Sequence, residues 1–461
     1  MRRARACGRI AIPPAPGNPH VTDRLAALYP QHLATVVARA ERALARGGFD
    51  HLLVAAGTEL YAFLDDNHYP FRTNPHFKAW VPLVAHPHSW IAFTPGRRPV
   101  LCYHQPADYW HLPPAPPAGY WVEHFDLRVI GAPAEARAHL PSDLSRAAII
   151  GEPGAALDGV VPSNPPKVLA SLHLARTRKT PYEVECLRMA SLHAARAHRA
   201  AAAAFRERRS EHEIHRAYCE AAGQGEIELP YGNIVALNEH GATLHYQHQD
   251  RTAPAEHRSL LIDAGAQVHG YAADITRTYG DGGAEFTELL HAVNAVQMAL
   301  VAKVRAGQDY PALHVEAHHA LAGVLSAHGI VRMAPESIVE SGLSRAFFPH
   351  GLGHYLGLQV HDVAGFQRDE DGGTIERPPG HPYLRLTRVL EEGNVLTIEP
   401  GLYFIDLLLA PLREGAHARA VDWAKVGRLA PYGGIRIEDD VVVGAGEPEN
   451  LTRDAFRALA A

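Results

Sequence analysis

The chain has 461 residues, of which 47% are hydrophobic and 20% are charged. This length and composition predict one to three globular domains and exclude a mainly disordered chain. The formal net charge is −6 at pH 7, so no basic excess indicates a nucleic-acid partner. The longest apolar runs, 199–205 and 405–411, are far shorter than the roughly 20 residues that cross a bilayer. We therefore expect a soluble protein with no membrane partner.

Four cysteines, Cys7, Cys102, Cys186 and Cys219, are too widely spaced for a metal knuckle or a dense disulfide framework. This spacing indicates a reducing compartment, and we expect a cytoplasmic protein. Residues 1–20 begin with basic side chains and contain several prolines, but they have no apolar stretch of signal-peptide length. We expect a disordered extension over 1–20.

Short apolar runs alternate with helical stretches over 21–174, a pattern typical of a small α/β domain. A helix is expected over 31–46, ending at two glycines, and strands are expected over 51–56, 89–93 and 147–150. A connector with prolines and then basic residues occupies 162–180. It predicts a second domain over 175–461.

The second domain opens with two helices whose starts are marked by capping boxes. Thr180 is followed by a proline and, at the third position, by a glutamate, which predicts a helix to about residue 206. Ser210 and Glu213 repeat the pattern, and Gly223 can close this helix in the left-handed conformation.

The order of helix, helix and strands then occurs twice. The predicted strands and second helix pair are, in chain order, strands over 231–237, 258–263 and 270–279, helices over 284–305 and 310–328, and strands over 395–399 and 435–443. We expect an α+β fold in which two pseudo-symmetric helix pairs cover one curved antiparallel sheet. A site between the two halves would take ligands from both.

Five residues of metal-binding type stand where these strands would face the cleft, namely Asp263, Asp274, His354, Glu399 and Glu438. Three of the carboxylates lie in apolar strand sequences (LLID, LTIE and IRIE), where an unpaired charge is costly. Metal binding would satisfy all five residues together.

Four carboxylates carry a charge of −4, which two divalent cations balance. Oxygen-rich ligation with one imidazole favours Mn²⁺, with Co²⁺ or Zn²⁺ able to substitute. Two such ions about 3.5–4 Å apart can generate a hydroxide near neutral pH and polarise a carbonyl. The sequence therefore predicts a metal-dependent hydrolase.

Four motifs, HGLGHYLGLQVHDVAGF, LIDAGAQVHGYAADITRTY, VLTIEPGLYF and GGIRIEDDVVV, closely resemble the metallopeptidase family of pita-bread fold. Its members include Xaa-Pro dipeptidase (prolidase), aminopeptidase P and methionine aminopeptidase. The resemblance covers the chain from about residue 180 to its C-terminus. The N-terminal sequences LYPQHL, FLDDNHYPFRTNPHFKAWVP and PADYWH, and the later VDWAKVGRLAPYGGIRIEDD, further resemble bacterial Xaa-Pro dipeptidases.

The resemblance implies a role for each of the five residues. Asp263 would bind one ion, Asp274 and Glu438 would bridge both ions, and His354 with Glu399 would complete the shell of the other. Glu399 would also carry a proton from a hydroxide-forming water between the ions towards the leaving nitrogen.

Three histidines, His245, His350 and His361, match family positions for donors that bind substrate and stabilise the tetrahedral intermediate. Arg385 matches the arginine that binds the carboxylate of a C-terminal proline, although it could also be an exposed arginine. Tyr231 matches a tyrosine that lines the substrate site, and the position of Arg436 allows either support of that site or an ion pair with a metal ligand.

The function that the resemblance implies is hydrolysis of dipeptides with a C-terminal proline, whose tertiary amide offers no N–H to an ordinary peptidase. Aminopeptidase P activity on longer Xaa-Pro peptides is the alternative. A binding module without metals and a side activity on organophosphorus esters stay open. The resemblance also implies a homodimer in which the N-terminal domain of one subunit helps to close the partner's cleft.

Two further groups of histidines match no metal motif. The HEIH sequence at 212–215 lacks the spacing of HExxH, and His318 and His319 are neighbours in a predicted helix. We expect both groups to lie on polar helix faces.

Overall fold

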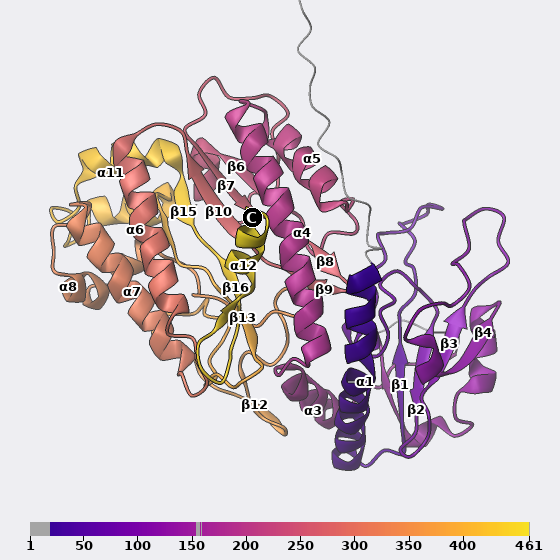
Figure 1. The fold of residues 1–461 in the computed structure, drawn as a ribbon. Coiled ribbons are helices and arrows are strands. Elements are labelled where there is room, and N and C mark those ends of the chain that lie inside the picture. Colours follow the sequence, from indigo (N-terminus) through magenta and orange to yellow (C-terminus); the bar gives the residue numbers. More distant parts are fainter. Residues whose placement is uncertain (1–18, 154–156, 158, 461) are drawn as a thin grey trace, which may run out of the picture.

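The computed structural model describes residues 19–153, 157 and 159–460, and Figure 1 shows their arrangement. The expected disordered extension over 1–20 lies outside the described residues, apart from its last two positions, which belong to the first helix. The chain forms a smaller N-terminal domain and a larger C-terminal domain, and the long helix α4, Pro181–Arg206, runs between them.

The N-terminal domain is built on one mixed sheet with the strand order β4-β3-β2-β1-β5. Its strands are β1 His51–Ala55, β2 Trp90–Phe93, β3 Val100–His104, β4 Asp126–Ile130 and β5 Ala147–Ile150. Pairs β1–β2 and β2–β3 are antiparallel, whereas β1–β5 and β3–β4 are parallel. Helices α1, Pro19–Gly47, and α3, Pro166–Arg176, pack beside each other, and α2 is the short Pro75–Lys78.

Helix α1 begins twelve residues before the predicted start, so the expected start at residue 31 was wrong. That start was placed directly after Pro30, which lies inside the helix. A proline removes one helical hydrogen bond, but packing of one face offsets this loss. Leu25, Tyr29 and Leu33 are buried on that face, and the Tyr29 hydroxyl donates to the Trp80 carbonyl oxygen at 2.5 Å.

The two predicted capping boxes are both present. The Thr180 and Ser210 side chains accept the amides at the third helical positions, and the glutamates there accept the cap amides in return. Helix α5, Glu211–Ala222, ends at Gly223, whose φ of 68° is left-handed as predicted. Helices α4 and α5 therefore begin and end where local chemistry places them.

The C-terminal domain contains only antiparallel pairings among the described strands. One three-stranded sheet has the order β10-β7-β6 and the other has the order β13-β16-β17, while β14 pairs with β15. An isolated bridge between Thr276 and Glu438 joins the two halves. The bounds are β6 Ile234–Leu237, β7 Ser259–Asp263, β8 Gln267–Val268, β9 Tyr271–Ala272, β10 Thr276–Gly280, β11 Gln367–Asp369, β12 Gly372–Thr374, β13 Val395–Ile398, β14 Gly401–Tyr403, β15 Gly434–Arg436, β16 Asp439–Val442 and β17 Glu449–Asn450.

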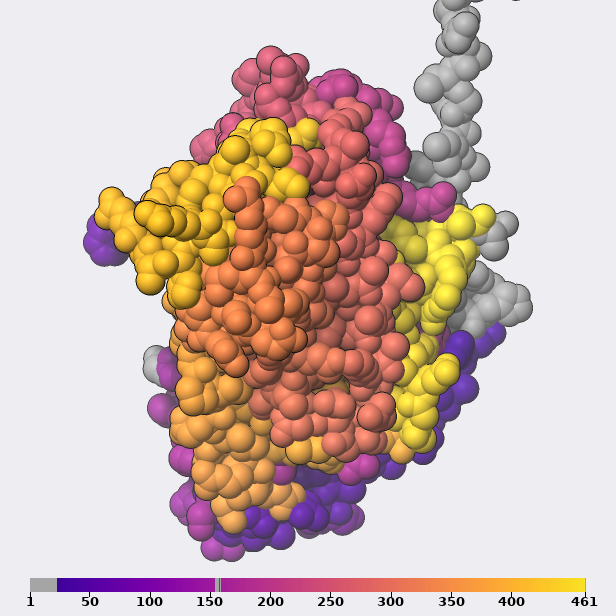
Figure 2. All heavy atoms as spheres, turned by 90° about the vertical axis from the view of Figure 1, so that its left-hand side faces the viewer, coloured from indigo at the N-terminus to yellow at the C-terminus, as the bar shows by residue number. Residues whose placement is uncertain are grey.

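The second helix pair covers the other half of these strands, so the predicted α+β fold with two helix pairs is confirmed. Helix α6, Ala284–Val301, stops short of the predicted residue 305, and α7, Tyr310–Ala327, follows it. The remaining helices are α8 Pro335–Glu340, α9 Leu343–Phe347, α10 Asp406–Leu409, α11 Trp423–Leu429 and α12 Leu451–Ala458. Figure 2 shows this face, on which the salmon and orange residues of α6 to α8 lie between two yellow segments from the end of the chain. None of the described helices is both long and apolar enough to cross a membrane.

Two predicted strands are broken in the structure. The strand expected over 270–279 is interrupted at Asp274, whose backbone amide donates to the Asp440 carboxylate at 3.2 Å instead of to a neighbouring strand. The strand expected over 435–443 is interrupted at Ile437 and Glu438. Both breaks coincide with predicted metal ligands, Asp274 and Glu438.

Candidate active site

A cavity of about 700 Å³ is lined by residues of both domains. Asp263, Asp274 and His361 line it from the C-terminal domain, and Arg72 and Lys78 line it from the N-terminal domain. Arg72 donates to the carbonyl oxygens of residues 229 and 230 at 3.1 and 3.2 Å, and Lys78 donates to that of residue 358 at 3.3 Å. These bonds hold the N-terminal domain against the cavity wall.

The five predicted ligands lie close to one another beside this cavity, and two of them, Asp263 and Asp274, line it. His354 Nε2 lies 3.4 Å from Asp274 Oδ2 and 3.8 Å from Glu399 Oε1. One donor atom each from Asp274, His354 and Glu438 lie within 4.8 Å of one another. Asp263 joins the group through the Tyr231 hydroxyl, which is 2.8 Å from Asp263 Oδ1 and 2.5 Å from Asp274 Oδ1.

Negative charge dominates this group of five residues. Burial raises the pKa of Glu438 well above its usual value, and neighbouring carboxylates raise it further. Burial also raises the pKa of Asp263, and it raises that of Glu399 to about 7, although Arg436 lowers both. The protein's own cations therefore do not balance the four carboxylates.

Asp274 and His354 form the exception, because they pair with each other. Burial opposes the charged form of each, yet their mutual interaction lowers the pKa of Asp274 and raises that of His354. His354 Nδ1 lies 2.9 Å from the Tyr355 carbonyl oxygen, which accepts its N–H and turns Nε2 towards the carboxylates. A metal ion could replace the proton at Nε2.

The residues present fit a dinuclear metal centre. Four carboxylates, of which two are buried and two are half-buried, and one oriented imidazole are the donors that hard or intermediate divalent ions prefer. Two such ions would supply the positive charge that the raised pKa values of Glu399 and Glu438 show to be lacking.

Arg436 is buried, and its guanidinium is held by three protein groups. Its guanidinium donates to Asp263 Oδ2 at 2.8 Å, to the Tyr403 hydroxyl at 2.9 Å and to Thr276 Oγ1 at 3.1 Å. Of the two predicted roles, this geometry favours the ion pair with a ligand over direct contact with substrate. The Tyr231 hydroxyl likewise lies within hydrogen-bond distance of two ligand carboxylates, those of Asp263 and Asp274, and the Tyr231 side chain lines the cavity.

The three predicted catalytic histidines occupy two different positions. His245 and His361 line the cavity, and the His361 ring lies 4.4 Å from the His354 ring at 83°. His350 lies deeper, where its Nε2 meets the Tyr403 hydroxyl at 2.8 Å and its Nδ1 lies 3.5 Å from Glu399 Oε2. Burial lowers the pKa of His350 to about 3, so this imidazole is neutral at physiological pH.

Arg385 is exposed, and its side chain forms no hydrogen bond or ion pair with any described residue. Its charge is one of the causes, after burial and His354, that lower the pKa of His361 to about 3. The Arg385 charge therefore acts on His361, although Arg385 is not among the residues that line the cavity.

Sequence reasoning missed several residues that support the ligands. Thr276 Oγ1 donates to Glu438 Oε2 at 2.6 Å, and Asp440 accepts the Asp274 amide and the Ser191 hydroxyl. Thr276 and Asp440 each lie two residues after a predicted ligand, so the two-residue period of a strand could have indicated them. Tyr403, which contacts both His350 and Arg436, had no such signal.

A buried set of metal-binding side chains at a cavity of this size defines a metal-dependent hydrolase. Comparison with known proteins agrees. Residues 27–174 match the model of the Xaa-Pro dipeptidase N-terminal domain, and residues 185–445 match that of metallopeptidase family M24. The chain belongs to metallopeptidase family M24.

Curated relatives cover nearly the whole chain. The Xaa-Pro dipeptidase of Xanthomonas campestris pv. campestris (strain 8004) is 57% identical over 435 residues, which are 94% of this chain and 99% of that protein. The Xaa-Pro dipeptidase of Stenotrophomonas maltophilia (strain K279a) is 57% identical over 433 residues, which are 94% of this chain and 98% of that protein.

Solved structures of aminopeptidase P share the fold. Escherichia coli aminopeptidase P with the inhibitor Pro-Leu has a TM-score of 0.66 at 22% identity, covering 92% of this chain and 95% of that chain. Pseudomonas aeruginosa aminopeptidase PepP has a TM-score of 0.66 at 22% identity, covering 93% of this chain and 98% of that chain. At this identity the likeness establishes the fold alone.

Proposed function

We propose that the chain is an Xaa-Pro dipeptidase, which hydrolyses dipeptides whose second residue is proline. The observation that carries this proposal is the convergence of four carboxylates and His354 beside one cavity, which two of the carboxylates line. The 57% identity to curated Xaa-Pro dipeptidases over 94% of the chain supports the choice of substrate.

The predicted ligands would hold two divalent ions, with Asp274 and Glu438 shared between them. Mn²⁺ is the ion we propose because oxygen donors outnumber the single imidazole, and Co²⁺ or Zn²⁺ could take its place. When bound, such ions supply a nucleophile at neutral pH and polarise the scissile carbonyl.

The remaining chemistry falls to side chains of the cavity. Glu399 takes a proton from the attacking water and delivers it to the proline nitrogen, which carries no proton in the tertiary amide. His350 lies beside this carboxylate, with its Nδ1 3.5 Å from Glu399 Oε2, but it donates that N–H to the Gly351 carbonyl oxygen at 2.8 Å. His245 and His361 donate to the carbonyl oxygen as negative charge develops on it.

Arg385 would select the substrate by its length. Its guanidinium is free of protein partners among the described residues, so both of its parallel N–H groups can bind a carboxylate. A dipeptide places its terminal carboxylate one residue beyond the scissile bond, near the His361 side of the cavity. Tyr231 fixes two of the ligands and lines the space beside them.

We also propose that the protein is a homodimer. Large apolar side chains are exposed in two loops of the N-terminal domain, namely Leu60, Tyr61, Phe63, Leu64, Tyr69, Tyr109, Trp110 and Leu112. The first of these loops leads directly into Phe71 and Arg72, which line the cavity. A partner subunit that covered these loops would remove their apolar surface from water and close the cleft.

Three further proposals concern the cell and the chain. A cytoplasmic location is supported by Cys102, Cys186 and Cys219, which are free thiols. Domain limits at 21–174 and 175–461 are supported by one core cluster confined to 53–160, by another confined to 286–443 and by the connector before α4. The third proposal, a disordered extension over 1–20, now concerns residues 1–18, which lie outside the described residues, because α1 begins at Pro19.

Aminopeptidase P activity is the second candidate, favoured by the fold shared with aminopeptidase P structures. The two activities differ in whether the substrate ends at proline. An enzyme that accepts longer peptides needs space where Arg385 would bind the carboxylate.

The test compares initial rates on one Xaa-Pro dipeptide and on the same peptide extended by one residue. Wild type and Arg385→Ala are each assayed with Mn²⁺ and with chelator, and Arg368→Ala, an exposed arginine outside the cavity, is the control. We expect metal-dependent cleavage of the dipeptide, with kcat/KM lowered about 100-fold in Arg385→Ala, the loss of about 3 kcal/mol that a bidentate carboxylate contact explains. Equal rates on both peptides and an unaffected variant would instead establish an aminopeptidase P activity.

A further inference from the structure

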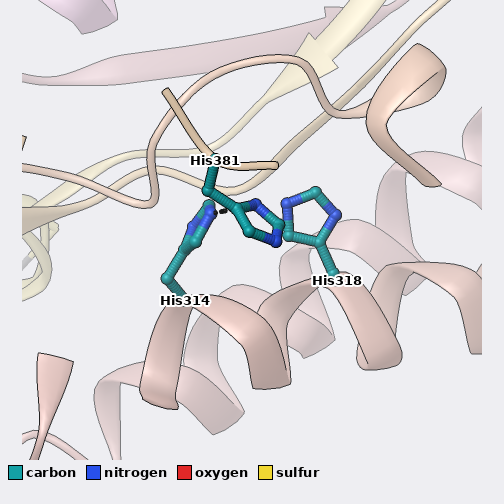
Figure 3. A group of neighbouring side chains, drawn as sticks. All are labelled: His314, His318 and His381. Carbon is teal, nitrogen blue, oxygen red and sulfur yellow. Dashed lines mark hydrogen bonds between the residues drawn. The ribbon is translucent and has the colours of Figure 1, made fainter. Parts of the chain in front are cut away.

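Three histidines outside the cleft lie against one another, as Figure 3 shows. His314 and His318 are one helical turn apart on α7, and His381 faces them from the turn between β12 and β13. His314 and His318 are each only 1% exposed. The prediction that His318 and His319 share a polar helix face was therefore wrong for His318, whereas His319 is exposed.

The three imidazole rings are arranged so that one nitrogen of each could bind the same metal ion. The ring centroids lie 4.8 Å apart for His314 and His318, 4.6 Å for His314 and His381, and 4.7 Å for His318 and His381. The interplanar angles are 89°, 89° and 62°, so the rings do not stack. One nitrogen from each ring lies within 4.8 Å of the others.

The hydrogen bonds of this group identify the ring nitrogens that face one another, and the buried nitrogen without a partner, His314 Nδ1, is not one of them. His314 Nε2 and His381 Nδ1 are 2.9 Å apart and share one proton, and His318 Nδ1 is 3.0 Å from the Ser344 hydroxyl. His314 Nδ1 is buried and has no hydrogen-bond partner. Burial lowers the pKa of His314 to about 3 and that of His318 to about 2, so both imidazoles are neutral and keep a lone pair for a ligand.

We propose that His314, His318 and His381 form a separate metal site that takes one nitrogen-preferring dication such as Zn²⁺. Zinc–nitrogen bonds of about 2.0–2.1 Å in a tetrahedral site place two nitrogens about 3.3 Å apart. The pair at 2.9 Å would need to open by only a few tenths of an ångström. The metal would replace the shared proton.

Charge explains why this site would choose an ion different from that of the cleft. No aspartate or glutamate of the described chain belongs to the group, and the guanidinium of Arg345 contributes to lowering the pKa of His318 and His381. Affinity must therefore come from the imidazole nitrogens alone. Zn²⁺, Cu²⁺ and Ni²⁺ bind imidazole strongly, whereas Mn²⁺ prefers oxygen and binds most weakly in this series.

A second group that contains a histidine differs, because its carboxylate already has all its hydrogen bonds within the protein. Glu211 lies with His240 and Asp250 in another possible ligand set. Its two carboxylate oxygens, however, already meet four donors at 2.8 Å, which are the Leu237 amide, the His240 ring, the Tyr246 hydroxyl and the Asp250 amide. Glu211 therefore anchors a loop and needs no ion.

A metal at the three histidines would connect α7 to the segment that carries Arg385. His381 belongs to a turn in which its amide donates to the Pro378 carbonyl oxygen, and Arg385 follows four residues later. Phe348 packs on His318 at 4.8 Å and on His350 at 4.9 Å between ring centroids, so it separates this site from the catalytic cavity. Zinc would hold the turn in place without taking part in the reaction.

The experiment measures zinc and manganese bound per subunit in the full-length protein. Each protein is equilibrated with Zn²⁺ in a large excess of Mn²⁺, freed of unbound metal by gel filtration and analysed by mass spectrometry for both elements. Wild type is compared with His318→Gln and His381→Gln. His319→Gln is the matched control, because His319 is the exposed neighbour on the same helix.

We expect wild type and His319→Gln to retain one zinc per subunit more than His318→Gln and His381→Gln do. Exchange of Mn²⁺ for zinc in the cleft would add the same amount to all four proteins and would not affect this difference. Should His318→Gln fail to fold, the zinc content of His381→Gln still tests the proposal, because this substitution changes a turn and not the helix. X-ray absorption of the extra zinc should show mainly nitrogen neighbours. Equal zinc in all four proteins, or an oxygen-rich shell, would overturn the proposal.

Discussion

Glu438 in the cleft and Asp362 beside it are both buried carboxylates, yet their pKa values move in opposite directions. Burial raises the pKa of Glu438 well above its usual value, and the nearby carboxylates add to this effect. Burial would also raise the pKa of Asp362, but Arg176 and Lys179 lower it to about 2. Their side chains meet Asp362 at 2.5 and 2.9 Å and are almost fully buried.

The difference lies in charge balance and not in burial. Asp362 has two cations of its own, which fix the loop after His361 to the connector before α4. The cleft carboxylates share Arg436 and His354 among four negative groups. A carboxylate that the protein neutralises is structural, and a set that it leaves unbalanced awaits a ligand from outside.

Removing the proton carrier of the cleft should have the largest effect on activity. In Glu399→Gln we expect kcat for an Xaa-Pro dipeptide to fall by about 10³-fold, because the amide cannot move the proton. Glu392→Gln, an exposed glutamate in the same segment, should keep the wild-type rate. Initial rates at saturating substrate check this prediction, and a loss of less than tenfold in Glu399→Gln would contradict it.

The second-largest effect should be the loss of thermal stability when the ions are removed. An ion present at about 1,000 times its Kd stabilises the folded state by about 4 kcal/mol, so chelation of the Mn²⁺-loaded protein should lower its Tm clearly. Glu438→Gln should lose much of this response, because it removes a shared ligand and one unbalanced charge. Thermal unfolding with and without chelator measures both effects, and an unchanged Tm in wild type would argue against an ion site.

Breaking the balanced group should cost stability without any dependence on metal. In Asp362→Asn, Arg176 and Lys179 remain buried without their partner, and we expect the free energy of unfolding to fall by about 3 kcal/mol. Asp371→Asn removes an exposed ion pair with Arg46 and should cost less than about 1 kcal/mol. Urea unfolding of both variants distinguishes the two cases, and equal losses would refute the contrast.

The smallest expected effect is that of acid on the balanced group. The pKa of Asp362 is lower in the folded state, at about 2, than its usual 3.8. Its stabilisation is therefore complete above about pH 4 and is lost as pH falls towards 2, by about 2 kcal/mol in total. Between pH 5 and pH 3, wild type should lose about 1 kcal/mol more than Asp362→Asn does, because about half of the total is lost over this interval. Unfolding of both proteins at these two pH values measures the difference, and equal losses would contradict the prediction.

Local chemistry predicted the helices well. The capping boxes at Thr180 and Ser210 and the left-handed Gly223 depend on neighbours within four residues, so the sequence contains the whole signal. The N-terminal half of α1 was missed because Pro30 looks like a helix boundary until the packing of Tyr29 is known. Tertiary contacts there outweigh local preference.

The site was predictable where residue type and motif agree, and less so where contacts cross the fold. All five predicted ligands converge, but the strand breaks at Asp274 and Glu438 follow from contacts between the two halves. Arg72 and Lys78 reach the cavity from the other domain, and no sequence pattern connects them to it. Burial of His318 likewise depends on a turn more than 60 residues away along the chain.

The metal site is tested most directly by the amount of Mn²⁺ that stays bound per subunit after gel filtration, measured together with dipeptide hydrolysis. We expect two Mn²⁺ ions in wild type, at most one in Glu438→Gln, and a parallel fall in activity. Two ions should remain in Asp362→Asn, whose carboxylate is balanced within the protein. Wild type without bound Mn²⁺, or Glu438→Gln with as much Mn²⁺ as wild type, would contradict the claim that the unbalanced carboxylates are the metal site.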